Sequence, residues 1–130
     1  MKNFPKIINF KFTKDKRGTF SKILSSKINN KLLKSDQIKE INISRNNKKG
    51  TVRGFHYQIG RFKEKKLIYC LKGKILDVSI NIDKKSKNYL KVYKKLLNEK
   101  DNKLLYIPEN YAHGYQTLSN NTILLYLHSK

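Results

Sequence analysis

Apolar and polar residues alternate with a period of two along most of this chain, a pattern typical of β-strands that bury one face. From position 76 to position 82, aliphatic residues occupy the even positions, and Asp, Ser and Asn occupy the odd ones. The segment 74–82 is therefore the clearest strand that the sequence predicts. Shorter patterns predict further strands at 7–12, 19–24, 38–44, 51–58, 67–71, 89–97, 103–107, 112–118 and 122–128.

Glycines and turn sequences separate these predicted strands. Only residues 25–34 indicate a helix, and their apolar spacing supports no more than a turn or two. Many short strands joined by turns predict an all-β sandwich or barrel, for which a jelly roll is the natural closure. Because the interior or mouth of such a barrel can hold one ligand, polar residues that point inward from strands are the candidates for chemistry.

The length of 130 residues is that of one domain, so we expect residues 1–130 to form a single domain. No apolar run is long enough to cross a membrane, and the N-terminus lacks the apolar segment of a signal peptide. The single cysteine, Cys70, excludes a disulfide framework, and its apolar neighbours predict a buried, unreactive thiol. These features predict a cytoplasmic protein that does not contact a membrane.

The chain carries a formal net charge of +21, from 30 Lys and Arg against 9 Asp and Glu. Such a balance often indicates a polyanionic partner. However, only four of the basic residues are arginine, which is the residue best suited to phosphate and base recognition. The lysines are also spread along the whole chain among many Asn and Ile residues, as in proteins from AT-rich genomes. The composition therefore favours codon bias over a dedicated nucleic-acid surface.

Residues 53–58 form the densest cluster of chemically capable side chains. Arg53, His56 and Gln58 stand within six residues of a predicted strand. Strict alternation would place Arg53 and His56 on opposite faces, but Gly54 permits a bulge that brings both inward. The alternative is an edge strand with a solvated arginine and a hydrogen-bonded core histidine.

Residues 107–115 form a second cluster, in which a Pro-Glu-Asn turn leads into a strand that carries His113 beside Gly114. An ordinary turn followed by a packed aromatic strand explains these residues equally well. Although two of the three histidines lie in these two clusters, the sequence has no His-x-His pair and no nearby acid at ligand spacing. We therefore predict no metal site.

In their order and spacing, several motifs together resemble the dTDP-4-dehydrorhamnose 3,5-epimerase family, whose members are nucleotide-sugar epimerases with a cupin-type jelly-roll fold. The resemblance runs from Asp15 to about Tyr126. The motifs that carry it are Asp-Lys-Arg-Gly-x-Phe at 15–20, Asn-x-Ser at 42–44, Gly-Thr-Val-Arg-Gly-Phe-His-Tyr-Gln at 50–58, Lys-Leu at 66–67, Gly-Lys-Ile-Leu-Asp-Val at 73–78 and Ile-Pro-Glu-x-Tyr-Ala-His-Gly-Tyr at 107–115.

The resemblance implies roles for individual residues. His56 matches the catalytic base, Lys66 the lysine beside the C4 carbonyl of the sugar, and Tyr126 the acid that works from the opposite face. Residues expected to bind the substrate are Arg17, Glu40, Asn42, Arg53, Gln58 and His113. Neither Lys66 nor Tyr126 would be singled out without the resemblance, since a lysine at a strand end and a core tyrosine are ordinary features.

The implied reaction is the epimerisation of a nucleotide-linked 4-keto-6-deoxy sugar at C3, C5 or both, through an enolate, for surface polysaccharide or deoxysugar biosynthesis. This chemistry needs a base that titrates near neutrality, a cation at the enolate oxygen and a second proton donor. It needs no metal or redox cofactor. Two alternatives stay open: a short cupin nucleotide-sugar 3,4-ketoisomerase, and a binding member of the fold with weak catalysis.

The chain departs from the family pattern in ways that affect the expected site. Lys22 and Glu40 stand on the nucleotide-binding side, where the family usually has Glu and Gln, so the identity of the nucleotide stays open. The family's usual C-terminal segment, which supplies the carboxylate paired with the catalytic histidine, is not in this sequence. Asp77 is therefore the candidate partner of His56.

The oligomeric state follows from the predicted N-terminal strand. The segment 7–12 is expected to form an exposed apolar edge, which proteins usually cover. Members of the family form dimers that exchange an N-terminal strand, so we expect a homodimer.

Overall fold

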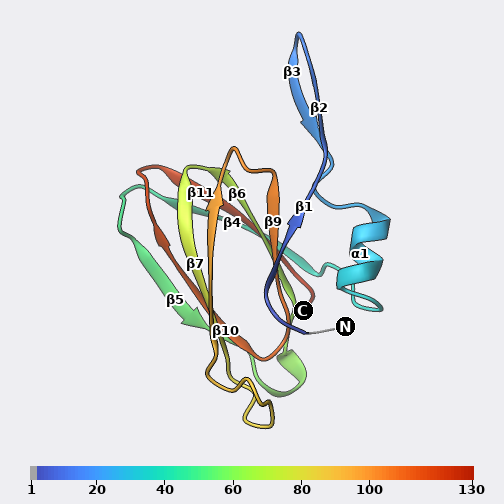
Figure 1. Ribbon diagram of the computed structural model, residues 1–130, viewed down its shortest axis with the longest axis vertical. Coiled ribbons are helices and arrows are strands. Elements are labelled where there is room, and N and C mark those ends of the chain that lie inside the picture. Colours follow the sequence, from blue (N-terminus) through green and yellow to red (C-terminus); the bar gives the residue numbers. More distant parts are fainter. Residues whose placement is uncertain (1–2) are drawn as a thin grey trace.

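The computed structural model describes residues 3–130, and its regular secondary structure is almost all β-strand, packed as a two-sheet sandwich (Figure 1). One sheet has five antiparallel strands in the order β1-β9-β6-β11-β4. These strands are β1 (Lys6–Asn9), β9 (Lys103–Ile107), β6 (Lys66–Lys72), β11 (Thr122–His128) and β4 (Glu40–Asn46). The facing sheet has the order β5-β10-β7-β8, with β5 (Val52–His56), β10 (Tyr111–Thr117), β7 (Lys74–Asn81) and β8 (Val92–Asn98).

Four short elements complete the structure. Strands β2 (Phe12–Asp15) and β3 (Gly18–Ser21) form a separate hairpin that projects beyond one end of the sandwich in Figure 1. Helix α1 (Ser26–Leu32) lies beside the five-stranded sheet, and the 3-10 helix η1 (Gly60–Phe62) connects β5 to β6. The jelly-roll sandwich predicted from the alternating pattern is thus confirmed.

The five-stranded sheet is covered on both faces, which explains the nearly continuous apolar runs of its central strands. On one face, Ile68 of β6 and Leu105 of β9 belong to the core between the two sheets. On the other face, Leu67 and Leu104 pack with Leu33 at the end of α1. All five of these side chains are fully buried. A strand buried on both faces needs no alternation, so β6 and β9 read as apolar runs.

The alternation in β7 has the opposite consequence. Its polar residues Asp77, Ser79 and Asn81 are buried inside the sandwich, whereas Val78 and Ile80 lie on the outer face and are half-exposed. The interior beside this strand is therefore polar. A polar interior is where a jelly roll can hold a ligand.

The N-terminal region differs from its prediction in strand boundaries. The expected strand 7–12 ends at Asn9, because Phe10 is buried against Tyr69 with ring centroids 5.5 Å apart, and a second strand begins at Phe12. The weak helix expected within 25–34 is confirmed as α1, which begins after Ser25, whose hydroxyl accepts a 3.3 Å hydrogen bond from the Ile28 amide. The strand expected at 89–97 begins only at Val92, since Leu90 adopts a positive φ of 62°.

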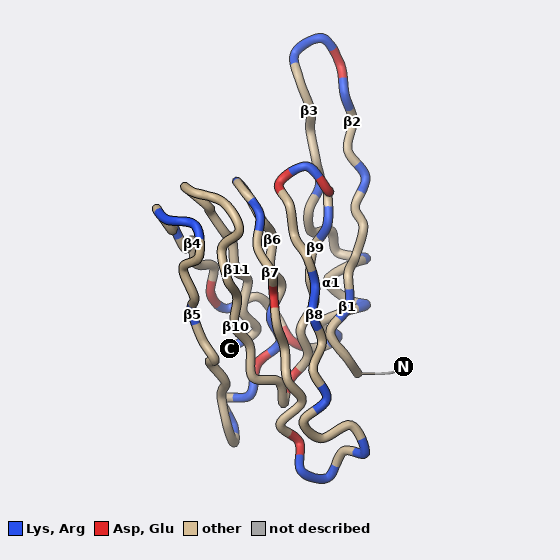
Figure 2. Tube along the Cα trace, turned by 60° about the vertical axis from the view of Figure 1, so that its left-hand side comes forward, with Lys and Arg blue, Asp and Glu red and all other residues tan. Residues whose placement is uncertain are grey.

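The basic residues are spread over the structure and are not concentrated in one region. Figure 2 shows basic residues at the tip of the β2–β3 hairpin, in the β7–β8 loop at the opposite end and along the strands between them. Within residues 3–130, no helix has the length and apolar character needed to span a membrane.

Candidate active site

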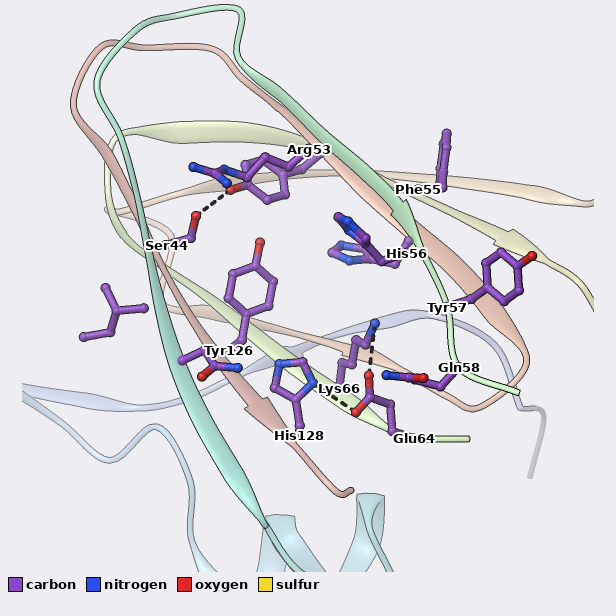
Figure 3. Close-up of a pocket in the computed structure, with 14 residues that line it drawn as sticks. Ser44, Arg53, Phe55, His56, Tyr57, Gln58, Glu64, Lys66, Tyr126 and His128 are labelled. Atoms are coloured by element: carbon purple, nitrogen blue, oxygen red, sulfur yellow. Dashed lines mark hydrogen bonds and ion pairs between the residues drawn. The ribbon is translucent and has the colours of Figure 1, made fainter. Parts of the chain in front are cut away.

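A pocket of about 550 Å³ opens between the two sheets (Figure 3). Side chains from both sheets line it. The four-stranded sheet contributes Arg53, Phe55, His56, His113 and Tyr115, and the five-stranded sheet contributes Asn42, Ile43, Ser44, Lys66, Tyr126 and His128. The segment between β5 and β6 adds Tyr57, Gln58 and Glu64.

An irregular pairing of β5 with β10 places both Arg53 and His56 at the pocket. His56 is opposite His113, and Arg53 is opposite Tyr115, so β5 has one residue more than β10 between the two pairs. Gly54 makes this possible: its φ is +118°, and a Cβ there would lie 2.6 Å from the Cα of Gly114. The predicted bulge is confirmed, and both side chains line the pocket.

His56 lies at the pocket rim, exposed and on an edge strand. It is not the buried core histidine of the alternative interpretation. Among residues 3–130, no carboxylate forms an ion pair or hydrogen bond with its imidazole. In Figure 3, Phe55 and Tyr57 lie on either side of it along the same strand end.

The expected pairing of Asp77 with His56 is wrong. Asp77 instead contacts His113, with 2.5 Å between Oδ2 and Nε2, and both side chains are almost completely buried. The reason is the order of strands in the sheet. Asp77 and His113 point inward from the adjacent strands β7 and β10, whereas His56 lies on β5, on the other side of β10. The buried pair fixes the His113 ring at the pocket wall.

A polar network holds Arg53 in place. Its Nε donates a 2.8 Å hydrogen bond to Asn46 Oδ1, which also accepts a 3.3 Å bond from the Tyr115 hydroxyl. The Tyr115 hydroxyl is in turn 2.8 Å from Ser44 Oγ. Because Asn46 accepts only from Nε, the two terminal nitrogens of the guanidinium can both donate to an anionic group.

Lys66 and Tyr126 occupy the opposite wall from His56. Lys66 is buried at the start of β6, and its ammonium is 3.3 Å from Glu64 Oε1. Tyr126 of β11 lies among the rings of His113, Tyr115 and His128, with centroids 6.0–6.3 Å away. Burial, followed by the proximity of Tyr115, raises the pKa of the Tyr126 hydroxyl far above its usual range, so the phenol stays protonated at neutral pH. In Figure 3 that hydroxyl is directed toward Arg53.

Glu64 and His128 complete the site, and the sequence interpretation did not assign Glu64 to it. Glu64 Oε2 is 3.2 Å from His128 Nδ1. Burial alone would raise the pKa of Glu64, but the hydrogen bond with His128 and the charge of Lys66 outweigh it and lower that pKa below its ordinary value. The available signal was the i, i+2 spacing of Glu64 and Lys66, which places two side chains on one face of an extended segment.

Of four further residues expected to bind substrate, two line the pocket and two lie outside it. Gln58 and Asn42 line the pocket. Glu40 lies at the exposed start of β4, where it accepts a hydrogen bond from the Asn42 amide. Arg17 is outside the pocket of its own chain, at the tip of the β2–β3 hairpin, where its side chain is 90% exposed and forms a 2.6 Å ion pair with Asp15.

The charged groups of the site suit an anionic ligand. Arg53 and Lys66 are the cations, and they approach the pocket from opposite sheets. Within the described residues, no group of three or more His, Cys, Asp or Glu side chains is placed to hold a metal ion.

Comparison with known proteins agrees with the geometry. The family model of dTDP-4-dehydrorhamnose 3,5-epimerase matches residues 5–130. Enzymes of that name from Sinorhizobium fredii and Shigella flexneri are 32% and 31% identical to this chain, each over 86% of it. The chain spans about three fifths of these relatives, 57% and 62% of their respective lengths.

Solved structures give the same result. The dTDP-4-dehydrorhamnose 3,5-epimerase of Sulfolobus tokodaii has a TM-score of 0.89 and 35% identity, covering 97% of this chain and 70% of its own. The Bacillus anthracis enzyme, solved with TDP and pyrophosphate, has a TM-score of 0.91 and 28% identity, covering 97% and 72%. The chain therefore belongs to the dTDP-4-dehydrorhamnose 3,5-epimerase family.

Proposed function

We propose that this protein epimerises a nucleotide-linked 4-keto-6-deoxy sugar at carbons next to the ketone. The observation that carries the proposal is the pocket between the sheets, which has His56 on one wall and Lys66 and Tyr126 on the other. A base and an acid on opposite walls can act on opposite faces of a sugar ring held between them. Inversion of a carbon centre requires such an arrangement.

The first step is removal of a proton from carbon. His56 takes the proton from C3 or C5, and the electron pair of the C–H bond moves to form the C=C bond of an enolate, leaving negative charge on the C4 oxygen. A positioned base of this kind contributes roughly 10²–10⁴-fold to the rate. Lys66 supplies the positive charge at the enolate oxygen, and its burial strengthens that interaction.

The second step returns a proton to the other face. Tyr126 stays protonated because of its burial, so it can donate to the enolate carbon, which is far more basic than a phenolate. The C–H bond forms with the opposite configuration and the C4 carbonyl is restored. Exchange with solvent then reprotonates the Tyr126 phenolate and removes the proton from His56.

The remaining pocket residues suit the nucleotide diphosphate. Arg53 offers the paired donors that phosphate oxygens accept, and His113, Asn42 and Gln58 supply further polar contacts on both walls. The names of the relatives refer to dTDP sugars, and one related structure, from Legionella pneumophila, holds dTDP-4-keto-L-rhamnose. We propose a dTDP sugar for this chain too, used in the cytoplasm to build surface polysaccharide or another deoxysugar product.

We further propose a homodimer in which Arg17 serves the pocket of the second copy. Strand β1 is an edge of the five-stranded sheet, and the hairpin beyond it exposes Phe12 and Phe20 together with Arg17. A projecting hairpin with exposed aromatic residues and an arginine far from its own pocket is suited to covering a neighbouring molecule.

Deuterium exchange tests the proposed function in one experiment. The protein is incubated in D₂O with a dTDP-linked 4-keto-6-deoxyhexose, and proton NMR follows the C3 and C5 positions and the configuration. Exchange with formation of an epimer supports the proposal. A carbonyl shifted to C3 would instead identify a 3,4-ketoisomerase, and binding without exchange would identify a binding member of the fold. GDP-, CDP- and UDP-linked sugars tested in parallel determine the nucleotide preference.

A further inference from the structure

Glu64 contacts two other pocket residues, Lys66 and His128, through separate carboxylate oxygens. Its Oε1 is 3.3 Å from the Lys66 ammonium, and its Oε2 is 3.2 Å from Nδ1 of His128 (Figure 3). All three side chains are shielded from solvent, with exposed fractions of 10% for Glu64, 9% for Lys66 and 16% for His128. The carboxylate therefore fixes the positions of both neighbours.

His128 is placed beside Tyr126 on the wall opposite His56. The two residues are two positions apart on β11, so their side chains share a face, and their rings stack with centroids 6.0 Å apart. Both line the pocket. Figure 3 shows Glu64 on one side of the His128 ring and Tyr126 on the other. With Nδ1 held by Glu64, the second ring nitrogen, Nε2, is available to the pocket.

Glu64 keeps a charged partner whether or not His128 carries a second proton. A shielded carboxylate needs a cationic partner, because an unpaired buried charge is strongly unfavourable. Lys66 supplies that partner permanently, so Glu64 stays paired whether His128 is neutral or protonated. In both states Nδ1–H donates to Glu64, and only the proton on Nε2 comes and goes. Other groups beside His128 are Glu40, its partner across the β11–β4 pairing, and the ring of Tyr126.

We infer that His128, oriented by Glu64, is a second proton donor of the pocket beside Tyr126. The inference rests on the proposed function, since it assigns a step of the same reaction. After His56 has formed the enolate, Nε2–H of protonated His128 transfers its proton to the enolate carbon. The C=C electron pair forms the new C–H bond, the C4 carbonyl is restored, and His128 is left as a neutral imidazole. Exchange with water then reprotonates His128 and deprotonates His56.

Two donors on one wall suit a substrate with two acidic carbons. C3 and C5 both flank the C4 ketone, so inversion of both requires proton delivery at two places on one face of the ring. Glu64 is then a positioning residue that acts through His128. A purely structural Glu64–His128 pair would brace the start of β6 and leave the course of proton return unchanged.

The test compares exchange with inversion in D₂O for the wild type, His128→Asn and Glu64→Gln. Loss of the donor should leave His56 able to remove and return a proton on its own face, so deuterium still enters without inversion. We expect the ratio of inversion to exchange at C3 or C5 to fall by about tenfold or more in His128→Asn, and in the same direction but less in Glu64→Gln. Asp36→Asn is the matched control, because it removes a carboxylate from a 2.7 Å lysine ion pair outside the pocket, and it should leave the ratio unchanged.

A second measurement does not depend on turnover. Imidazole ¹⁵N spectra of the wild-type protein above neutral pH should show neutral His128 with its proton on Nδ1, facing Glu64. A proton on Nε2 in the neutral ring would overturn the inference. So would an unchanged ratio of inversion to exchange in His128→Asn, or a loss of both exchange and inversion in that variant. If the wild-type protein neither exchanges nor inverts any of the nucleotide sugars, the proposed function is wrong, and this inference fails with it.

Discussion

The exposed position of His56 determines what its removal should do. The imidazole makes no ion pair or hydrogen bond to a carboxylate within residues 3–130, so its loss leaves no buried group unpaired. We expect His56→Ala to reduce C–H exchange by roughly 10²-fold or more, with nucleotide affinity within a few-fold of the wild type. Deuterium incorporation and calorimetry with dTDP measure the two effects. Substantial exchange in the variant would remove His56 from the role of base.

His113 should behave in the opposite way, because it is the polar partner of a buried carboxyl group. Asp77 is 1% exposed, and its Oδ2 is 2.5 Å from His113 Nε2. His113→Ala leaves that carboxylate without its partner, which costs about 3–5 kcal/mol of folding free energy in comparable buried pairs. Urea denaturation should show a lower midpoint at unchanged slope. A midpoint equal to that of the wild type would mean that the buried pair contributes little to stability.

Substitution of Tyr126 tests whether the proton returns to the opposite face of the sugar from the one that His56 deprotonates. Tyr126→Phe keeps the ring in its aromatic surroundings and removes only the hydroxyl. The variant should still exchange the proton that His56 removes, but inversion of at least one carbon should slow by roughly tenfold or more. NMR of the product in D₂O separates exchange from inversion. Wild-type inversion at both carbons would make Tyr126 a core aromatic only.

The chemistry of individual residues was only partly predictable from the sequence. Arg53 and His56 stand in one dense cluster, and the pocket contains both. The partner of Asp77 depends on which strands are neighbours, and the sequence does not determine that β10 lies between β5 and β7. The Glu64–His128 contact likewise joins residues 64 positions apart, so it depends on the pairing of β11 with β6.

At the scale of elements, the bulged pairing of β5 with β10 is the feature on which the site depends. Gly54 combines a φ of +118° with a backbone contact that leaves no room for a Cβ, since Gly114 Cα and His113 O would lie 2.6 and 2.8 Å away. Gly54→Ala should therefore destabilise the protein by more than the ~1–2 kcal/mol expected from a positive φ alone, and should displace Arg53 and His56.

Gly50→Ala is the control for this prediction. Gly50 also has a positive φ, +84°, but a Cβ there would meet no atom within 4 Å. It should show the conformational cost without the clash, and exchange activity near that of the wild type. Chemical denaturation and the deuterium assay compare the two variants. Equal effects of both substitutions would show that the close approach of β5 to β10 is not what requires glycine.

Element prediction succeeded where one periodicity governs a segment. The alternation in 74–82 correctly predicted β7, because each of its faces has one environment throughout. It failed at Phe10, whose burial against Tyr69 depends on a strand far along the chain and breaks the predicted strand in two. It also gave α1 only weakly, since the short helix is stabilised by packing of Leu32 and Leu33 on the five-stranded sheet.

At the scale of the whole molecule, the proposed homodimer explains why an arginine expected to bind substrate lies outside its own pocket. Arg17 lies at the hairpin tip with its side chain 90% exposed, and Phe12 and Phe20 on the same hairpin are 49% and 71% exposed. Light scattering should give twice the 15.4 kDa mass of the chain at micromolar concentration. A monomeric mass would contradict both the dimer and the proposed role of Arg17.

Mixing two impaired variants tests whether Arg17 acts in the neighbouring pocket. Arg17→Ala should raise the KM for the nucleotide sugar by about tenfold, the loss of one charge-assisted contact to phosphate. If Arg17 serves the other copy, a dimer of one Arg17→Ala chain and one His56→Ala chain has one pocket with both side chains intact. Random mixing of such chains should then restore about a quarter of the wild-type activity at low substrate concentration. If Arg17 served its own pocket, every pocket in the mixture would lack one of the two groups, and activity would not exceed the average of the separate variants. The recovered activity therefore tells directly whether the hairpin completes the site of the second molecule.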